Sequence, residues 1–211
     1  TYKDIVFLTG HESRIIDILS LESDLQKVSN QNNLHNIEFT SFYELPSCND
    51  WIHKMQDVIS KMSKYNSGGD KAVGFKLRCG GVEAGMFPDV HHIAESIIAC
   101  RNASIPMKFT AGMHHPVGHY NKSVKAKMYG FFNIFIGGMM AYKFNLNKEE
   151  LVTTLLDEHP ANFNFSENAL KWKDYSIKNN EIQKYRQEAF ISFGSCSFDE
   201  PKHDMRELGL L

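Results

Sequence analysis

Two hydrophobic patterns alternate along the first half of the chain. Short runs that are apolar, or that alternate between apolar and polar residues, are typical of strands and occupy residues 4–9, 36–45, 71–78 and 106–112. Stretches in which apolar residues recur every three or four positions are typical of helices. They occupy residues 13–29, where the polar run SNQNN ends the pattern, and 50–63, and Pro88 suits the start of a third helix. Because a parallel connection needs a crossover, this rhythm predicts an α/β fold with parallel strands.

The rhythm changes after His119. The apolar pattern predicts a long helix over residues 122–143, and Asn147 with Glu150 three positions later resembles a capping box that opens the next helix. Further helical segments are predicted over residues 166–175 and 181–188, a fifth strand over residues 190–198, and a closing helical turn over residues 204–208.

Five strands are too few to close an eight-stranded barrel. We expect a single α/β domain over residues 1–211, helix-rich after residue 120, in one of two forms. The first is βα-barrel-like, as in a TIM-type barrel that lacks an N-terminal portion; the second is an open parallel sheet flanked by helices. The first form is considered because the chain starts on Thr1, without a methionine, and enters a strand almost at once.

Composition narrows the classes of partner. Hydrophobic content of 42%, charged content of 23% and a net charge of -2 are ordinary for a globular protein and favour neither nucleic acid nor a membrane as partner. The most apolar run, residues 131–142, is too short to span a bilayer. The four cysteines are far apart, which indicates reduced thiols in a cytoplasmic protein. A homo-oligomer is compatible with this composition.

Alternation along the strands indicates where chemistry would occur. In residues 71–78 the side chains of Lys76 and Arg78 share one face, in residues 106–112 Lys108 and Thr110 share one, and Glu44 occupies the corresponding place in residues 36–45. If these strands are neighbours, the charged side chains converge near the C-terminal ends of the strands, where α/β folds place their sites. The simpler alternative is that these charges form solvated ion pairs on a sheet face.

Each of these residue types suits a role in a reaction on a small anionic, carbonyl-containing metabolite. Lys108 is predicted as nucleophile or base, with Lys76 as the second cation that lowers its pKa. Arg78 would bind the anion together with the backbone of Gly80 and Gly81, and His114 or Glu44 would move protons. The remaining predicted substrate-binding residues are Thr110, His115, Asn133, Ser195 and Cys196. Lyase-, aldolase- or isomerase-like chemistry fits this set.

Two other functions remain open from the residues alone. A metal-dependent enzyme would use Glu44 with His114 or His115, with a divalent cation as its only cofactor; otherwise no metal or other cofactor is predicted. A non-catalytic module would use the same cationic face to hold an anion or a partner protein. His91 and His92, early in the third helix, are interpreted as surface residues.

Several segments resemble an uncharacterised family of bacterial cytoplasmic proteins. They are KLRCGG, FPD, KFTAGMHHP, GFFN and the tail FGSCSFDEP…LGLL. They match the family's K-x-R-x-G-G, K-x-T-A-G-x-H-H-P and F-G-S-C-S-F-x-E-P segments, over about residues 76–211. The resemblance implies no reaction, but the family's proteins are longer at the N-terminus, which supports the truncated form. The strand KFTAG is also similar, over a few residues, to the Schiff-base strand of deoxyribose-phosphate-type aldolases.

Overall fold

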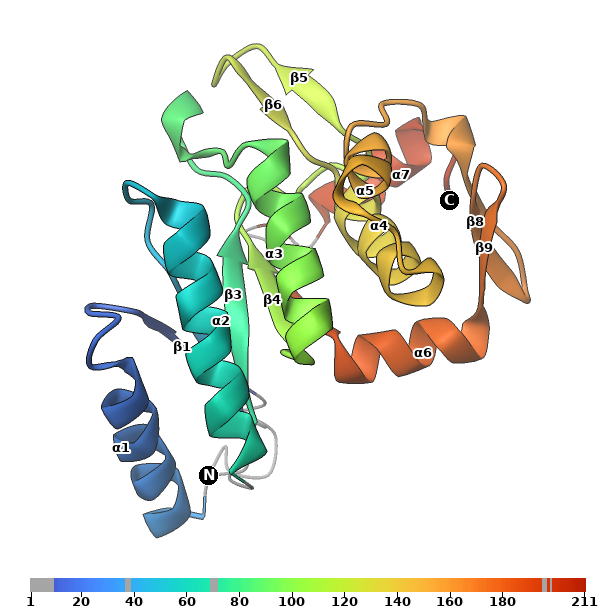
Figure 1. Ribbon diagram of the computed structural model, residues 1–211. Coiled ribbons are helices and arrows are strands. Elements are labelled where there is room, and N and C mark those ends of the chain that lie inside the picture. The colour runs from blue at the N-terminus through green and yellow to red at the C-terminus, as the bar shows by residue number, and fades with distance from the viewer. Residues whose placement is uncertain (1–9, 37–38, 69–71, 195–196, 198) are drawn as a thin grey trace, which may run out of the picture.

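A five-stranded parallel sheet forms the centre of the protein in a computed structural model (Figure 1). The structure describes all residues except 1–9, 37–38, 69–71, 195–196 and 198. The strands of the sheet are β1 (Gly10–Arg14), β2 (Thr40–Glu44), β3 (Val73–Arg78), β4 (Met107–Thr110) and β10 (Phe190–Gly194), in the spatial order β1-β2-β3-β4-β10. Neighbouring strands are parallel throughout, which confirms the α/β class.

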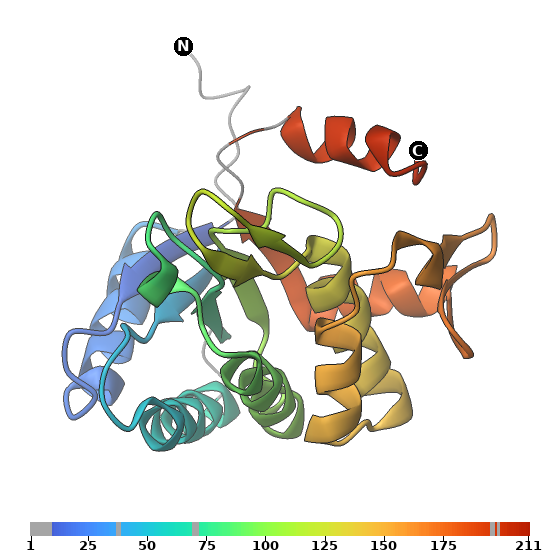
Figure 2. The ribbon, with the colours of Figure 1, turned by 90° about the horizontal axis from the view of Figure 1, so that it is seen from above.

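Helices cover one side of this sheet. The helices α1 (Leu21–Leu34), α2 (Trp51–Ser67) and α3 (Val90–Ala103) follow β1, β2 and β3 in turn and lie side by side. Together with α4 (Phe131–Phe144) and α5 (Lys148–Leu155) these helices form an arc, and α6 (Asn179–Glu188) leads into β10. Figure 2 shows this arc along one side of the sheet, while α7 (Glu200–Glu207) lies on the other side. A right-handed connection between consecutive parallel strands places successive helices on the same face.

The core lies between the sheet and this helical layer. Phe75 of β3 and Met107 and Phe109 of β4 are fully buried there, against helix residues such as Met55 and Ile93. Each buried side chain of this kind contributes roughly 1.5–3 kcal/mol. The alternate strand residues therefore point to the opposite face, which carries the charged side chains.

Two small antiparallel sheets are attached to the second half of the chain. One is the hairpin of β5 (His119–Asn121) and β6 (Ala126–Met128), and the other contains β7 (Phe163–Phe165), β8 (Ala169–Trp172) and β9 (Tyr175–Lys178). Single 3-10 turns, η2 (Ala84–Met86) and η3 (Pro160–Asn162), lie in connecting segments.

The N-terminal elements differ from those predicted. The strand predicted over residues 4–9 lies outside the described residues, and β1 begins at Gly10, where the pattern predicted a strand end. The helix predicted over residues 13–29 is wrong in position, since α1 starts at Leu21 and continues through the polar run. The apolar stripe was misleading because Ile16 and Leu19 are 92% and 89% exposed in the connection, whereas Ser29 and Asn32 are buried on the inner side of α1.

Two helices predicted in the second half differ for a similar reason: the one over residues 122–143 is confirmed only from residue 131, where α4 begins, and the one over residues 166–175 is wrong. Residues 122–128 belong to the β5–β6 hairpin, whose turn is held by the Asn121 side chain accepting hydrogen bonds from the backbone of Ser123 and Val124. The segment predicted as helix over residues 166–175 forms most of the β8–β9 hairpin. The spacing of its apolar residues fits the period of a helix as well as that of a strand, and only the pairing of the strands decides between them. The capping box of Asn147 and Glu150 is confirmed at the start of α5.

The described part of the chain forms an open sheet, and no closed barrel occurs within it. None of its helices is long and apolar enough to cross a bilayer.

Candidate functional site

A row of polar side chains crosses the sheet on the face opposite the helices. Strand register pairs Glu44 with Lys76, Lys76 with Lys108, and Lys108 with Ser192 of β10. Arg78 and Thr110 are paired in the next layer, towards the C-terminal ends of the strands. The predicted convergence of Glu44, Lys76, Arg78 and Lys108 on one face is therefore present.

Glu12 of β1 connects the two lysines. Its carboxylate oxygens lie 2.6 Å from Lys76 Nζ and 2.9 Å from Lys108 Nζ. Lys108 also donates a hydrogen bond of 3.1 Å to Ser192 Oγ. The sequence pattern did not indicate Glu12, because it predicted the first strand to end before Gly10. With the strand begun at Gly10, the same alternation places Glu12 on the charged face.

Glu44 is the buried centre of a second ion-pair group. Its carboxylate is 3% exposed and lies 2.9 Å from Lys76 Nζ and 3.0 Å from Arg78 Nε. Burial alone would raise the pKa of Glu44, but the hydrogen bonds from Lys76 and Arg78 hold it below its ordinary value. Burial acts on the pKa of Glu12 in the same direction and is likewise outweighed by Lys76 and Lys108. Both carboxylates are therefore charged at neutral pH.

The environment of Lys76 does not lower its pKa. Burial acts in that direction, but hydrogen bonds to Glu12 and Glu44 raise the pKa above its ordinary value. The sequence predicts Lys76 as the second cation that lowers the pKa of Lys108. In the structure Glu12 lies between the two ammonium groups. Lys76 is therefore a permanent cation.

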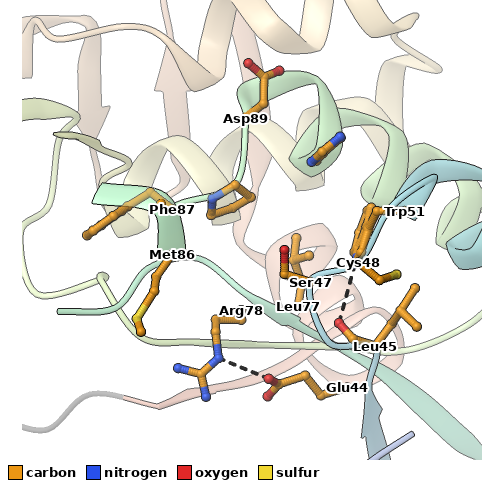
Figure 3. Close-up of a pocket in the computed structure, with 13 residues that line it drawn as sticks. Glu44, Leu45, Ser47, Cys48, Trp51, Leu77, Arg78, Met86, Phe87 and Asp89 are labelled. Carbon is orange, nitrogen blue, oxygen red and sulfur yellow. Dashed lines mark hydrogen bonds and ion pairs between the residues drawn. The ribbon is translucent and has the colours of Figure 1, made fainter. Parts of the chain in front are cut away.

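A pocket opens beside this network at the C-terminal ends of β2 and β3 (Figure 3). Its cavity volume is about 210 Å³. Arg78 and Glu44 line it from the sheet, and the half-exposed Arg78 keeps its two terminal nitrogens available while its Nε is held by Glu44. The remaining lining residues are Leu45, Ser47, Cys48, Trp51, Leu77, Gly85, Met86, Phe87, Pro88, Asp89 and His92.

The α2 and α3 helices contribute an aromatic wall. Trp51 begins α2, donates its indole N–H to Leu45 O at 3.4 Å, and lies with its ring centroid 5.2 Å from that of His92. We interpreted His92 as a surface residue, but it lines the pocket. Its position in the first turn of α3 is set by Asp89, whose side chain accepts a hydrogen bond from the backbone of His91 and caps the helix.

The histidines after β4 form a different cluster. His115 Nδ1 lies 2.6 Å from Asp204 Oδ2 of α7, and its ring is 4.4 Å from that of His119. His114 Nδ1 lies 3.6 Å from Glu200 Oε2, also on α7. These side chains attach α7 to the rest of the protein and do not line the pocket.

The structure gives no support to the predicted metal site. The Glu44 carboxylate is ion-paired with Lys76 and Arg78, whereas His114 and His115 face α7. Over the described ranges, no group of three or more His, Cys, Asp or Glu side chains is arranged to hold a metal ion.

Three predicted binding residues have other surroundings. Asn133 is fully buried in α4, donates to Thr154 O and Asp157 O, and accepts from Gly118 N, so it does not face the site as expected. Gly80 allows the connections after β3 and β4 to approach, since a Cβ there would lie 2.9 Å from Gly112 Cα, and a Cβ on Gly81 would meet the Met86 side chain. Both glycines are thus explained by packing.

Thr110 remains on the charged face, and its buried Oγ1 has no hydrogen-bond partner within the described part of the chain. Ser195 and Cys196 lie outside the described residues. Cys48, which played no part in the prediction, is exposed at the pocket, whereas burial raises the pKa of Cys79 and Cys100.

Comparison with protein-family models, with curated proteins and with solved structures found no significant match to this chain.

Proposed function

We propose that this protein is an enzyme that binds a small anionic, carbonyl-containing metabolite at the C-terminal end of its sheet. The observation that carries the proposal is the position of Arg78. Its guanidinium is fixed through Nε on the buried Glu44, is 48% exposed, and lines a cavity with apolar walls. A guanidinium held in this way keeps four N–H groups, enough for the bidentate binding of a carboxylate.

Lyase- or isomerase-like chemistry is proposed for Lys108, which lies on the charged face outside the pocket lining, with Glu12 as its proton acceptor. The substrate is held at Arg78 and its carbonyl carbon extends from the pocket towards Lys108. Lys108 passes a proton to the Glu12 carboxylate, and the neutral amine attacks the carbonyl carbon of the substrate. The carbonyl oxygen then takes up protons, including the one held by Glu12, and leaves as water, so that a protonated imine replaces the ammonium group. Lys76 stays protonated and stabilises negative charge beside the reacting atoms.

The arrangement of the sheet supports a βα-barrel-like relationship for the fold. Strands β1, β2, β3 and β4 follow one another in sequential order, and α1, α2 and α3 share one side. Doubly wound sheets reverse their strand order and place helices on both faces, whereas βα barrels do neither. In such barrels the inner face and the C-terminal strand ends carry the site, which is where Arg78 and Lys108 lie.

Reductive trapping tests this function. The protein is incubated with pyruvate and sodium borohydride, and the modified peptides are identified by mass spectrometry. We expect a saturable adduct on Lys108, absent from Lys108→Met and reduced in Arg78→Met. Lys122→Met is the matched control, because Lys122 is an exposed lysine of the β5–β6 turn.

The opposite result would be adducts spread over exposed lysines at the same yield in the wild type and in Lys108→Met. In that case Lys108 is not the nucleophile. Pyruvate binding that depends on Arg78, without any adduct, would favour the second candidate, a non-catalytic module that only holds an anion. This candidate is favoured by one observation: Lys108 is ion-paired with Glu12 and hydrogen-bonded to Ser192.

A further inference from the structure

We propose that the pocket at Arg78 selects monocarboxylates with a short apolar tail and discriminates against phosphate and phosphate esters. This inference rests on the proposed function, because it names the substrate class of the same pocket. Both the charges of the lining residues and the shape of the pocket support this selectivity.

Among the described residues that line the pocket, Arg78 is the single permanent cation. Arg78 faces the cavity, whereas Lys76 and Lys108 do not line it. Two carboxylates, Glu44 and Asp89, are also part of the lining, and the positive charge of Arg78 is shared with Glu44 at 3.0 Å. A carboxylate has one negative charge and matches one guanidinium, but a phosphate monoester carries about −1.5 to −2 at pH 7. The second charge of a phosphate would meet no second permanent cation among the described lining residues, while Glu44 and Asp89 add negative charge to the same lining.

The helix end at this pocket is already occupied. The N-terminus of a helix is a common binding site for phosphate, because its free N–H groups point at the ligand. At the start of α3, however, the Asp89 side chain accepts the backbone N–H of His91 at 2.8 Å. A carboxylate thus takes the place that a bound phosphate would need, which removes the strongest alternative way of binding a dianion.

Apolar side chains contribute about half of the pocket wall. Figure 3 shows Met86 and Phe87 on one side of the pocket and Leu45 and Trp51 on the other. Trp51 is held in place by its hydrogen bond to Leu45 O and by its contact with the His92 ring. A ring already fixed in this way loses little entropy when an apolar group packs against it.

The volume sets the size of the tail. A cavity of about 150 Å³ holds benzene, so that a cavity of about 210 Å³ suits a ligand of about six to nine non-hydrogen atoms. A carboxylate accounts for three of these atoms, and the rest make a short branched chain or a small ring. Within the carbonyl-containing class proposed above, 4-methyl-2-oxopentanoate has this size and form.

Isothermal titration calorimetry at constant ionic strength tests the selectivity. The probes are 4-methyl-2-oxopentanoate, pyruvate and inorganic phosphate. We expect 4-methyl-2-oxopentanoate to bind about tenfold or more tighter than pyruvate, as apolar groups do in a fitted pocket, and phosphate to bind most weakly. Arg78→Met should abolish binding of both oxo acids, whereas Arg206→Met, which changes an exposed arginine of α7, should leave it unchanged.

Two further variants separate tail recognition from charge. Trp51→Leu should weaken the binding of 4-methyl-2-oxopentanoate about tenfold and the binding of pyruvate much less. Tyr120→Leu is the control variant, because Tyr120 is 60% exposed and does not line the pocket. Asp89→Asn keeps a good capping side chain but removes the negative charge, so it should strengthen phosphate binding several-fold. Asp174→Asn, at an exposed turn, should not.

Different results would contradict the selectivity of the pocket and the anion site itself. If phosphate binds as tightly as 4-methyl-2-oxopentanoate and both depend on Arg78, or if Trp51→Leu weakens both oxo acids equally, the selectivity is wrong while the anion site stands. If the Arg78→Met variant, folded as judged by circular dichroism, binds all three probes like the wild type, the anion site itself is wrong and the proposed function falls with it.

Discussion

Lys76 Nζ lies 2.6 Å from Glu12 Oε2 although β2 separates their two strands. The distance between β1 and β3, two strand spacings, is about 10 Å. Lys108 of β4 also contacts Glu12, across three strand spacings or about 14 Å. Only long side chains can meet over such distances, and the Glu12 carboxylate therefore joins lysines of β3 and β4 across the charged face.

The two lysines should differ in their contribution to stability. Lys76 bridges Glu12 and Glu44 and is 12% exposed, whereas within the described part of the chain Lys108 forms an ion pair only with Glu12, which is more open to solvent. Lys76→Met should lower the free energy of unfolding by about 2–4 kcal/mol and Lys108→Met by about 1 kcal/mol, because solvent screens the second pair. Urea denaturation measures both, with Lys122→Met as control; equal losses would contradict the shared role of Lys76.

Glu44→Gln should destabilise the protein in a pH-dependent way. Because Lys76 and Arg78 depress the folded-state pKa of Glu44, its stabilisation is complete above its ordinary value of 4.5 and is lost as pH falls through the lower folded-state pKa. The difference in unfolding free energy between wild type and variant should thus be about 2–4 kcal/mol at pH 7 and shrink below pH 4.5.

Glu188→Gln, which changes an exposed glutamate, serves as the reference variant for this comparison. A difference that stays constant from neutral to strongly acidic pH would mean that the ion pairs of Glu44 do not account for the loss.

His119 should make the protein less stable in mild acid. Burial, with the neighbouring His115 ring, lowers the pKa of His119 below its ordinary value of 6.5. As pH falls through 6.5 the unfolded chain binds this proton first, so the stabilisation present above pH 6.5 decreases until the folded-state pKa is reached.

The corresponding variant, His119→Gln, should lose less stability than the wild type between pH 7.5 and about 5.5. Urea unfolding at the two pH values checks this, and His35→Gln, at an exposed position, should behave like the wild type. The groups that face His119 are His115, the carbonyl of Val117, Asp204 and Glu158, and the first of these opposes its protonation while the other three favour it.

Asn133→Ala should affect the fold and not the specificity of the pocket. The variant removes three buried hydrogen bonds that join α4 to the backbone at Gly118, Thr154 and Asp157. We expect a loss of about 3 kcal/mol or more, since buried partners are left unsatisfied. Thermal unfolding measures it against Asn168→Ala, an exposed asparagine. A nearly neutral Asn133 variant would contradict this structural role.

Local signals were sufficient for the middle of the chain. The segments β2, α2, β3, α3 and β4 have strong periodicity and clear boundaries, such as Pro88 shortly before α3, and all five were predicted. The β8–β9 hairpin was not, because the spacing of Leu170, Trp172 and Tyr175 fits a helix as well as a strand. Their period is decided by pairing with β7, a contact that the local pattern does not contain.

Local patterns were enough to predict the α/β class and the charged face, because alternation within a strand assigns each side chain to one side whatever the strand's neighbours are. The same alternation placed Glu44, Lys76, Arg78 and Lys108 on one face. Three contacts became visible in the folded protein alone: Glu12 joins both lysines, His92 and Trp51 line the pocket beside Arg78, and His115 faces α7. These contacts join segments far apart in the chain. They depend on strand order, curvature and helix docking, which no local pattern encodes.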